Sequence, residues 1–342
     1  MSHRNAIILF CDGTYIPFAA WTAGGLVANG ALETCDVIVL SPDEAGLDLV
    51  REHCPGVLAE HIAADFAPFG FTDVPDDFPT RSFLNLFAPH YFEARYDRLI
   101  LCDVDYEITS PDMPRLFELE MKTYPLAAMR DIIGLHPTYA EANHKRYYAP
   151  ADLPITTPYL NGGFQVIDVK PYLGERVAER ALASTLERGG PKYLGDQRAL
   201  NAVLRGDWME LSPNCNWAAV WPNQNPAHGA YAKRVLRPCG VHLLGAAKPW
   251  RTNRPGRIDP DLSQRMTEWF AASPWPAEIP EQDLSRNAAL IAKVEAEAPP
   301  ISQVFAPEVL RYMKRDFEDI SQGLAPSFDP QGLLADTGAE TG

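Results

Sequence analysis

The sequence lacks the features that mark several protein classes. Its 342 residues include six cysteines, none in a C-x-x-C pair, which argues against a disulfide framework. No apolar run approaches the roughly 18–20 residues of a membrane helix. The first apolar run, residues 6–10, is too short for the core of a signal peptide. We therefore expect a cytoplasmic globular protein with reduced thiols.

Basic residues are also scarce, with 30 Lys and Arg against 45 Asp and Glu. A chain of net charge −15 has no bulk attraction for nucleic acid or for anionic lipid. Residues 301–342 carry three basic and seven acidic side chains, so this end is acidic as well. These counts predict no nucleic-acid partner and no stable membrane association.

Short apolar runs alternate with helix-like segments over the first 110 residues. Runs at 6–11, 36–40 and 98–102 indicate buried strands, and residues 17–31 suit a helix. Such alternation predicts an α/β fold with a largely parallel sheet whose two faces are covered. Ligands of these sheets bind beyond the carboxyl ends of the strands. The residues that follow the runs, above all 12–15 and 103–105, are therefore candidates for a site.

Two carboxylates follow the run at 98–102. In an extended chain the side chains of Asp103 and Asp105 point the same way, because successive residues alternate sides. Two such carboxylates make a hard oxygen site for magnesium or manganese, with open positions for phosphate oxygens. A solvated turn after a strand would have the same sequence, so both interpretations stay open on this motif alone.

A second motif lies far along the chain, in residues 242–250. An imidazole from His242 would suit manganese better than magnesium as a third ligand. Lys248 would supply a point charge for a phosphate, and Gly245 would let the backbone approach it. A buried structural histidine is the alternative, and the whole H-x-x-G-x-x-K-P-W string favours the ligand.

Five segments in this order resemble glycosyltransferase family 8. They are residues 7–15, 99–105, 160–164, 195–197 and 242–248, so the likeness spans about residues 5–250. Members of that family are retaining enzymes that use nucleotide-diphosphate sugars with manganese, and they include lipopolysaccharide galactosyltransferases and glycogenin. The resemblance implies the GT-A fold: a mixed, mainly parallel sheet flanked by helices, here with a C-terminal helical extension.

The resemblance also implies roles for individual residues. Asp103, Asp105 and His242 would bind Mn²⁺, or Mg²⁺, that bridges the donor diphosphate. Asp12 and Tyr15 would contact the base and ribose of a UDP-sugar. The full set of implied donor-binding residues is Asp12, Tyr15, Arg81, Val104, Asn161, Gly245 and Lys248. The implied catalytic residues are Asp131, Asp196 and Gln197, of which Gln197 would lie beneath the anomeric carbon.

Retention of the anomeric configuration sets a mechanistic question. A double displacement needs a carboxylate nucleophile, whereas the matching side chain here is the amide of Gln197. We therefore expect front-face attack, in which the donor's own phosphate oxygen accepts the proton of the acceptor. The expected activity is transfer of galactose or glucose from UDP to a carbohydrate or glycoconjugate. The acceptor, the choice of hexose and the oligomeric state stay open.

Three other functions share features with this sequence. Residues 10–14 resemble the D-x-D-G-T loop of haloacid-dehalogenase-like phosphatases, but Phe10 stands where those enzymes have their nucleophile. A non-catalytic nucleotide-sugar-binding or scaffold protein of the same fold stays open. So does glycogenin-like self-glycosylation, for which Tyr139, Tyr147 or Tyr148 would be the acceptor.

Domain boundaries follow from the prolines, which number 31 and cluster after residue 252. We expect a catalytic domain over residues 1–250 and a proline-rich helical extension over 251–322, in which 302–322 forms an amphipathic helix. Residues 323–342 are polar and rich in glycine, and we expect them to be disordered.

Overall fold

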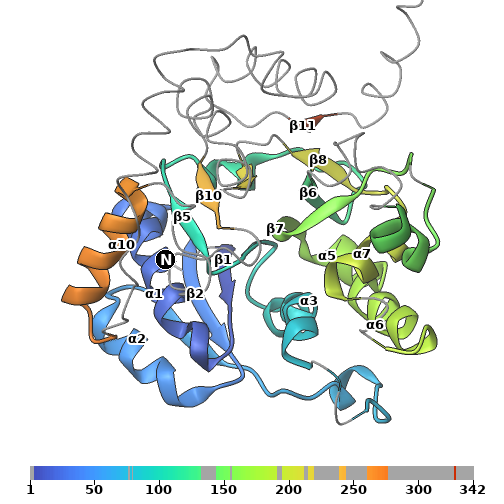
Figure 1. Cartoon of the computed structure of the whole chain (residues 1–342), viewed down its shortest axis with the longest axis horizontal. Coiled ribbons are helices and arrows are strands. Elements are labelled where there is room, and N and C mark those ends of the chain that lie inside the picture. The colour runs from blue at the N-terminus through green and yellow to red at the C-terminus, as the bar shows by residue number, and fades with distance from the viewer. Residues whose placement is uncertain are drawn as a thin grey trace, which may run out of the picture.

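The computed structural model describes residues 4–75, 78, 80–131, 144–154, 156–190, 195–211, 215–218, 239–243, 260–275 and 327–328. Its described strands form a large sheet in the order β11-β8-β6-β7-β4-β1-β2-β3 and a small sheet in the order β5-β10-β9 (Figure 1). The strands of the large sheet are β1 (Asn5–Phe10), β2 (Asp36–Ser41), β3 (Leu58–His61), β4 (Arg98–Cys102), β6 (Leu126–Arg130), β7 (Leu160–Asp168), β8 (Met209–Leu211) and β11 (Ser327–Phe328). Those of the small sheet are β5 (Tyr106–Ile108), β9 (Trp217–Ala218) and β10 (Gly240–His242).

The large sheet is mixed and mainly parallel, as the sequence predicts. Its parallel pairs are β1–β2, β1–β4, β2–β3 and β6–β8, and its antiparallel pairs are β4–β7, β6–β7 and β8–β11. Side chains of β1 alternate between two hydrophobic clusters: Ile7 and Leu9 enter one, and Ala6 and Ile8 enter the other. Because both faces are buried, β1 is apolar from Ala6 to Phe10 rather than alternating with polar residues.

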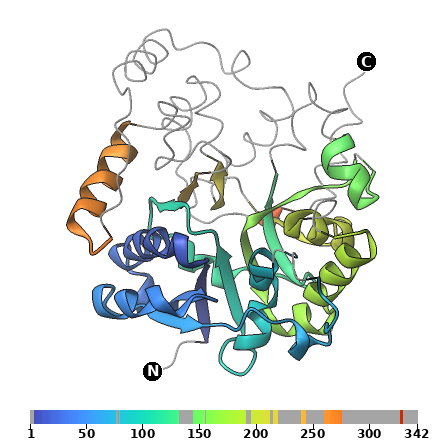
Figure 2. The ribbon, with the colours of Figure 1, turned by 60° about the horizontal axis from the view of Figure 1, so that its bottom comes forward.

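Helices cover both faces (Figure 2). One face carries α1 (Ile16–Ala28), α2 (Leu47–His53) and α10 (Pro260–Ala272). The other carries α3 (Thr80–Phe92), α5 (Val169–Gly174), α6 (Val177–Glu187) and α7 (Asp196–Leu204). Short turns of 3-10 helix are η1 (Gly13–Tyr15), η2 (Ala31–Glu33), η3 (Glu44–Gly46), η4 (Ala67–Phe69), η5 (Met113–Glu118) and η9 (Ala149–Ala151), and η8 (His144–Tyr148) is a π-helical turn. Because both faces of the sheet are covered, a ligand would bind beyond the carboxyl ends of the central strands.

Helix α10 lies within the region that we expected to be a proline-rich helical extension. Its Phe270 packs edge-on against Phe18 of α1, with ring centroids 5.2 Å apart, and its Arg265 pairs with Glu107 of β5. The helix expected at 302–322 lies outside the described residues. Of residues 323–342, the structure describes Ser327 and Phe328, which form β11 beside the edge strand β8.

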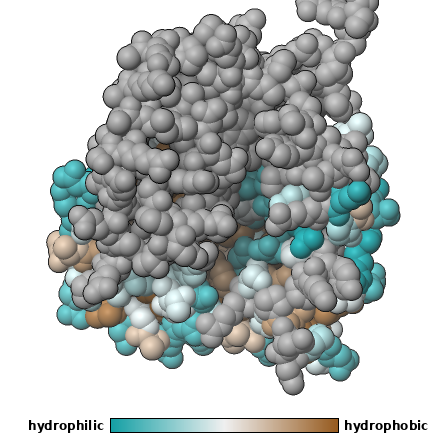
Figure 3. Space-filling model, in the orientation of Figure 1, coloured by the Kyte–Doolittle hydropathy of each residue, from teal (hydrophilic) through white to brown (hydrophobic). Residues whose placement is uncertain are grey.

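Hydrophilic and apolar residues alternate over the described surface in Figure 3. The large hydrophobic side chains that are exposed among the described residues are Leu58 and Tyr91, each 38% accessible. No helix in the described ranges is both long and apolar enough to cross a membrane. The buried apolar side chains of the described residues form the two hydrophobic clusters of the core.

Candidate functional site

The pairing of two very short strands brings distant residues of the sequence together. Asp103 and Asp105 lie in the bend between β4 and β5, directly after the carboxyl end of β4. Strand β10 runs antiparallel to β5 with His242 opposite Tyr106, and the Leu243 N–H donates to the Asp105 carbonyl at 2.8 Å. This register puts the imidazole of His242 beside the two carboxylates.

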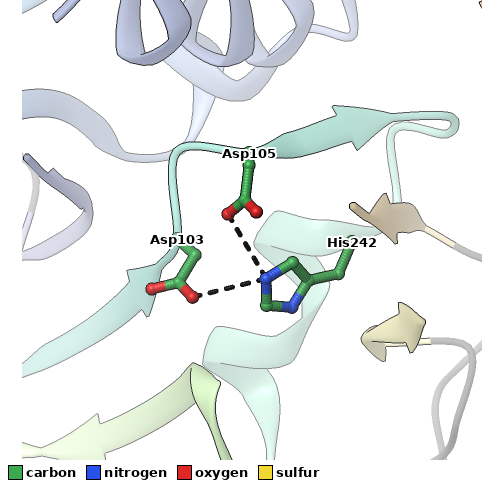
Figure 4. Close-up of side chains that lie close together, drawn as sticks. All are labelled: Asp103, Asp105 and His242. Atoms are coloured by element: carbon green, nitrogen blue, oxygen red, sulfur yellow. Dashed lines mark ion pairs between the residues drawn. The ribbon is translucent and has the colours of Figure 1, made fainter. Parts of the chain in front are cut away.

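The three side chains face one another (Figure 4). The Nε2 atom of His242 lies 3.3 Å from Asp103 Oδ2 and 3.3 Å from Asp105 Oδ1. One ligand atom from each residue can be chosen so that all lie within 4.8 Å of one another. His242 and Asp105 are buried, whereas the side chain of Asp103 is 46% exposed. The cluster is thus open on the side of Asp103.

These residues fit a divalent cation. Adjacent ligands of an octahedral ion with bonds of about 2.1 Å are about 3 Å apart, close to the observed separations. Two carboxylates and one imidazole form a donor set that suits manganese and tolerates magnesium. With the lone pair of the imidazole on Nε2, the three side chains would direct electron-pair donors at one point, and a metal ion there would balance their charge.

The surrounding residues fix the bend. Thr22 of α1, itself buried, directs its hydroxyl at the carbonyl oxygens of Val104 and Tyr106, at 2.8 and 2.9 Å. Asp103 N–H donates to the Gly163 carbonyl of β7 at 2.8 Å. A Cβ atom at Gly163 would lie 2.2 Å from His242 Cε1 and 2.7 Å from Asp103 Oδ2. Glycine is therefore required at 163 so that β7 can pass directly beneath the carboxylate and the imidazole.

A second polar cluster lies beside the first, where β6 and β7 meet α7. Asp131, which follows β6, is buried, and its Oδ2 accepts hydrogen bonds from Asn161 Nδ2 and Gln197 Nε2, both at 2.9 Å. Gln197 Oε1 in turn accepts from the Gly162 N–H at 2.9 Å. Two amides thus hold one carboxylate at the same edge of the sheet.

Helix α7 is itself fastened to β7 by Asn201, which the sequence analysis missed. Its side-chain amide donates to the carbonyls of Leu160 and Gln197 and accepts from the Leu160 N–H, over 2.8–3.0 Å. Asn201 lies one helical turn after Gln197, so it places that residue against the strand. A buried, bidentate amide of this kind has no sequence motif that would reveal it.

Asn216 is a further residue that the sequence analysis missed. Its Nδ2 donates to Asn161 Oδ1 at 2.8 Å, and its Oδ1 lies 2.9 Å from His242 Nδ1. Asn216 is buried and precedes β9, which pairs with β10. It therefore connects the carboxylate–imidazole cluster to the Asp131 cluster.

Asp196 is the first residue of α7, and Gly195 is the N-cap of that helix. Its Oδ1 accepts from the Gln197 N–H at 2.7 Å. Burial raises the pKa of the Asp196 carboxyl to about 6, with Asp103 adding to the shift and the hydrogen bond from Gln197 opposing it. The charge of this side chain accordingly changes within the physiological pH range.

The loop after β1 carries the implied nucleoside contacts. Asp12 caps η1 through bonds from the amide and hydroxyl of Thr14, at 3.0 and 2.6 Å. Asp43, which follows β2 and was not singled out from the sequence, accepts from the Gly13 N–H at 2.6 Å. Tyr15 packs against Phe18 with centroids 5.9 Å apart. These contacts set the shape of the loop at the carboxyl ends of β1 and β2.

Some of the remaining residues predicted from the sequence lie within the described ranges, and the others lie outside them. Val104 is buried, and its described polar contact is the bond from Thr22 to its carbonyl. Arg81 lies in the first turn of α3. Gly245 and Lys248 lie outside the described residues, as does Tyr139.

Two buried side chains near the site carry groups that could react, a tyrosine hydroxyl and a thiol. Tyr148, a candidate acceptor for self-glycosylation, is 2% exposed, and burial raises its pKa to about 12. Burial likewise raises the pKa of the Cys102 thiol well above its ordinary value, with Asp103 adding to the shift. Both side chains are buried in this arrangement.

Curated proteins of similar sequence exist in bacteria. The chain is 28% identical over 182 residues to General stress protein A of Bacillus subtilis (strain 168), which covers 50% of this chain and 60% of that protein. It is 23% identical over 171 residues to Lipopolysaccharide 1,2-glucosyltransferase of Escherichia coli (strain K12), covering 49% and 48%. The chain therefore spans about half the length of these curated relatives.

The structure resembles that of the galactosyltransferase LgtC in complex with donor and acceptor sugar analogs. The TM-score is 0.60 at 17% identity, over 81% of this chain and 98% of that one. At this identity the likeness concerns the fold, and it confirms the predicted GT-A arrangement of a mixed sheet between two helical layers. Residues 75–254 match the profile described as glycosyl transferase family 8, which includes β4, the bend and His242. With slightly more than half of its residues in that match, the chain belongs to glycosyl transferase family 8.

Proposed function

We propose that this chain is a retaining glycosyltransferase that moves a hexose from a UDP-sugar to a carbohydrate or glycoconjugate acceptor. The observation that carries the proposal is the position of two clusters side by side at the carboxyl edge of the sheet. Asp103, Asp105 and His242 suit a metal ion, and Asp131 with its two amides suits the hydroxyls of a sugar. A metal–diphosphate and the sugar attached to it need these two environments next to each other.

The first cluster would hold Mn²⁺, with Mg²⁺ as a substitute. When bound, the ion neutralises the negative charge that develops on the diphosphate as it leaves. The buried carboxylate of Asp105 and the imidazole of His242 would hold their positions before donor binds, since the bend is bonded to Thr22 and to β7. Such preorganisation lowers the energy of the transition state because no ligand has to reorient during the reaction.

The second cluster would orient the donor sugar. Asp131 accepts two amide bonds, so its carboxylate is fixed in place and can receive a sugar hydroxyl without reorganisation. Asn161 and Asp196 would bond further hydroxyls. Asp196 would do so best as a carboxylate, which its pKa of about 6 permits at neutral pH. Arg81, Lys248 and the Gly245 backbone would hold the phosphates, and Asp12 and Tyr15 the nucleoside.

The arrangement of Gln197 supports front-face transfer. Its Oε1 accepts the Gly162 N–H and its Nε2 donates to Asp131, so the neutral amide is held on both sides. An amide is a poor nucleophile, and Gln197 would instead stabilise positive charge at the anomeric carbon through its oxygen dipole. In the proposed step the acceptor oxygen forms a bond to that carbon. The bond to the phosphate oxygen breaks with its electron pair, and the acceptor proton moves to the leaving phosphate.

The donor hexose is proposed to be galactose or glucose. The name of one relative specifies a glucosyltransferase, and that of one structural neighbour a galactosyltransferase. We propose a catalytic domain over residues 1–250 with the following segment packed against it. The contacts of α10 with Phe18 and Glu107 support this arrangement.

Donor hydrolysis is the direct test. The purified chain is incubated with a panel of nucleotide sugars, with Mn²⁺, Mg²⁺ or chelator, and release of nucleoside diphosphate is measured. We expect slow release from one UDP-hexose, supported best by Mn²⁺ and abolished by chelator. The variant Asp48→Asn, altered at an α2 carboxylate whose side chain is 83% exposed, serves as a control with unchanged release.

Two outcomes would replace the proposal. Metal-dependent UDP binding without any release would point to a nucleotide-sugar-binding protein of the same fold. A mass increase of one hexose on the intact chain, located by peptide mapping to Tyr139, Tyr147 or Tyr148, would point to self-glycosylation.

A further inference from the structure

Four hydrogen bonds connect the two clusters of the site, and the direction of each can be worked out from a backbone N–H. The starting point is the backbone N–H of Gly163, which can only donate. It lies 3.0 Å from one side-chain atom of Asn161, so that atom is the oxygen, Oδ1. The other atom is then Nδ2, which agrees with its bond to the carboxylate of Asp131. The orientation of Asn161 thus follows from its neighbours.

The same reasoning extends to Asn216 and His242. Because Asn161 Oδ1 is an acceptor, the Asn216 atom 2.8 Å from it is the donor Nδ2. Asn216 therefore presents its oxygen to His242 Nδ1, at 2.9 Å. An oxygen can only accept, so Nδ1 carries the proton and the lone pair of the neutral ring is on Nε2. That is the nitrogen which faces Asp103 and Asp105.

We propose that Asn216 is a positioning residue that fixes His242 in its metal-binding tautomer and couples the metal cluster to the sugar cluster. The coupling part rests on the proposed function; the tautomer part stands on the hydrogen bonds alone. Outer partners of a ligating imidazole set its tautomer and orientation, and their loss costs about 10–100-fold in metal affinity. Asn216 also donates a hydrogen bond to Asn161, and Asn161 in turn donates one to Asp131.

The two bonds of Asn216 can be separated by mutation. Asn216→Asp keeps an acceptor for His242 Nδ1–H and removes the donor to Asn161. Asn161 cannot turn to compensate, because Gly163 N–H and Asp131 hold both ends of its amide. Asn216→Leu removes both bonds with a similar side-chain size. Thr185→Val, which removes a buried hydroxyl of α6 bonded within that helix, is the matched control for a buried polar loss remote from the site.

The first measurement needs no metal. The ¹⁵N NMR signals of the His242 ring, assigned by their loss in His242→Gln, report which nitrogen carries the proton. We expect protonated Nδ1 in the wild type, in Asn216→Asp and in Thr185→Val, and a mixture of tautomers in Asn216→Leu. Protonated Nε2 in the neutral ring of the wild type would overturn the proposal.

The second measurement is Mn²⁺ affinity by EPR at fixed pH, followed by the KM of the UDP-sugar. Asn216→Leu should bind Mn²⁺ about 10–100-fold more weakly. Asn216→Asp should bind it within about threefold of the wild type or more tightly, yet show a raised KM for the donor sugar with unchanged affinity for UDP. Equal behaviour of the two variants would refute the coupling. Failure of the wild type to bind Mn²⁺ would refute the proposed metal site instead, and the NMR result would still decide the role of Asn216.

Discussion

The two clusters of the site differ in how their charges are balanced. Around Asp131, each described bond joins a donor to an acceptor within the protein, so the arrangement is complete by itself. Around His242, three electron-pair donors converge, with carboxylate oxygens 3.3 Å from the ring nitrogen. The proposed sugar end is held by amides within the protein, whereas the candidate metal end has a donor set that a cation would balance. Mutations should separate the two ends by their dependence on metal.

The largest effect is expected from the metal end. Asp105→Ala removes a buried side chain that we propose binds the metal. A metal ion stabilises the transition state by several kcal/mol. At 1.36 kcal/mol per tenfold, its loss should lower the rate of donor hydrolysis about 10³-fold. Donor hydrolysis at saturating Mn²⁺ checks this. If the variant retained most of its activity, the cluster of Asp103, Asp105 and His242 would not be the metal site.

The next effect is expected at the sugar end and should not depend on metal. Gln197→Ala removes the amide that fixes Asp131 and faces the proposed anomeric carbon, and we expect kcat to fall about 10²-fold with Mn²⁺ affinity unchanged. Single-turnover kinetics and Mn²⁺ titration measure the two quantities. A stable glycosyl-enzyme formed by Gln197→Glu on the normal reaction path would instead favour double displacement.

Gly163→Ala tests the narrowest contact between the two ends. Its Cβ would lie 2.2 Å from the ring of His242, so either the ring or β7 must move. We expect Mn²⁺ affinity to fall about 10–100-fold, as for a displaced ligand. Gly174→Ala is the matched control, since a Cβ there meets no atom within 4 Å.

Thr22→Val is expected to act on both stability and metal affinity. It leaves the carbonyls of Val104 and Tyr106 without their buried hydroxyl donor, at a cost of about 1–3 kcal/mol in the free energy of unfolding. Because the bend then loosens, Mn²⁺ affinity should fall several-fold. Denaturant unfolding of the wild type, Thr22→Val and Thr185→Val measures the free energy of unfolding of each. A larger decrease in Thr22→Val than in Thr185→Val would be the part due to the bend rather than to loss of a buried hydroxyl in general.

The smallest effect is expected from Asp196, and it depends on pH. Its pKa is raised from 3.8 to about 6 on folding, so the folded state binds more protons in that interval. Stability therefore falls as pH rises from about 4 to about 6, and the loss persists at higher pH. Asp196→Asn should raise the free energy of unfolding at pH 8 by about 2 kcal/mol at most, after allowance for partial exposure.

The same variant should have a raised KM for the donor at pH 8. In the wild type, that KM should rise as pH falls through about 6. Denaturant titrations and donor kinetics at pH 5 and pH 8 check both signs. A variant less stable than the wild type at pH 8 would show that the Asp196 charge is compensated in the folded state.

The sequence predicts the parts of this molecule that have strong local signals. The apolar runs 6–11, 36–40 and 98–102 became β1, β2 and β4. Strands β5, β8 and β10 have three residues each, too few to show a period. The sequence does not predict α3, because Pro89 and several aromatic side chains obscure its helical pattern.

The site divides in the same way. Asp103, Asp105 and His242 stand in recognisable motifs, so their proximity was predicted from the sequence and is found in the structure. Asn216, Thr22 and Asn201 act through hydrogen bonds that exist only once the chain has folded. The buried pair of Arg130 and Glu210, at 2.7 Å, likewise depends on β6 lying beside β8, which no local pattern indicates.

The pairing of β10 with β5 has a consequence for the order of folding. Two of the candidate ligands are adjacent on the chain and form part of a bend that α1 and β7 fasten, whereas the third arrives on a strand synthesised much later. Contacts between such distant segments form slowly, because a long loop must close first. During translation, the growing chain would assemble its central sheet before it gains the imidazole. The three candidate metal ligands would then come together only after the strand that carries His242 has been made.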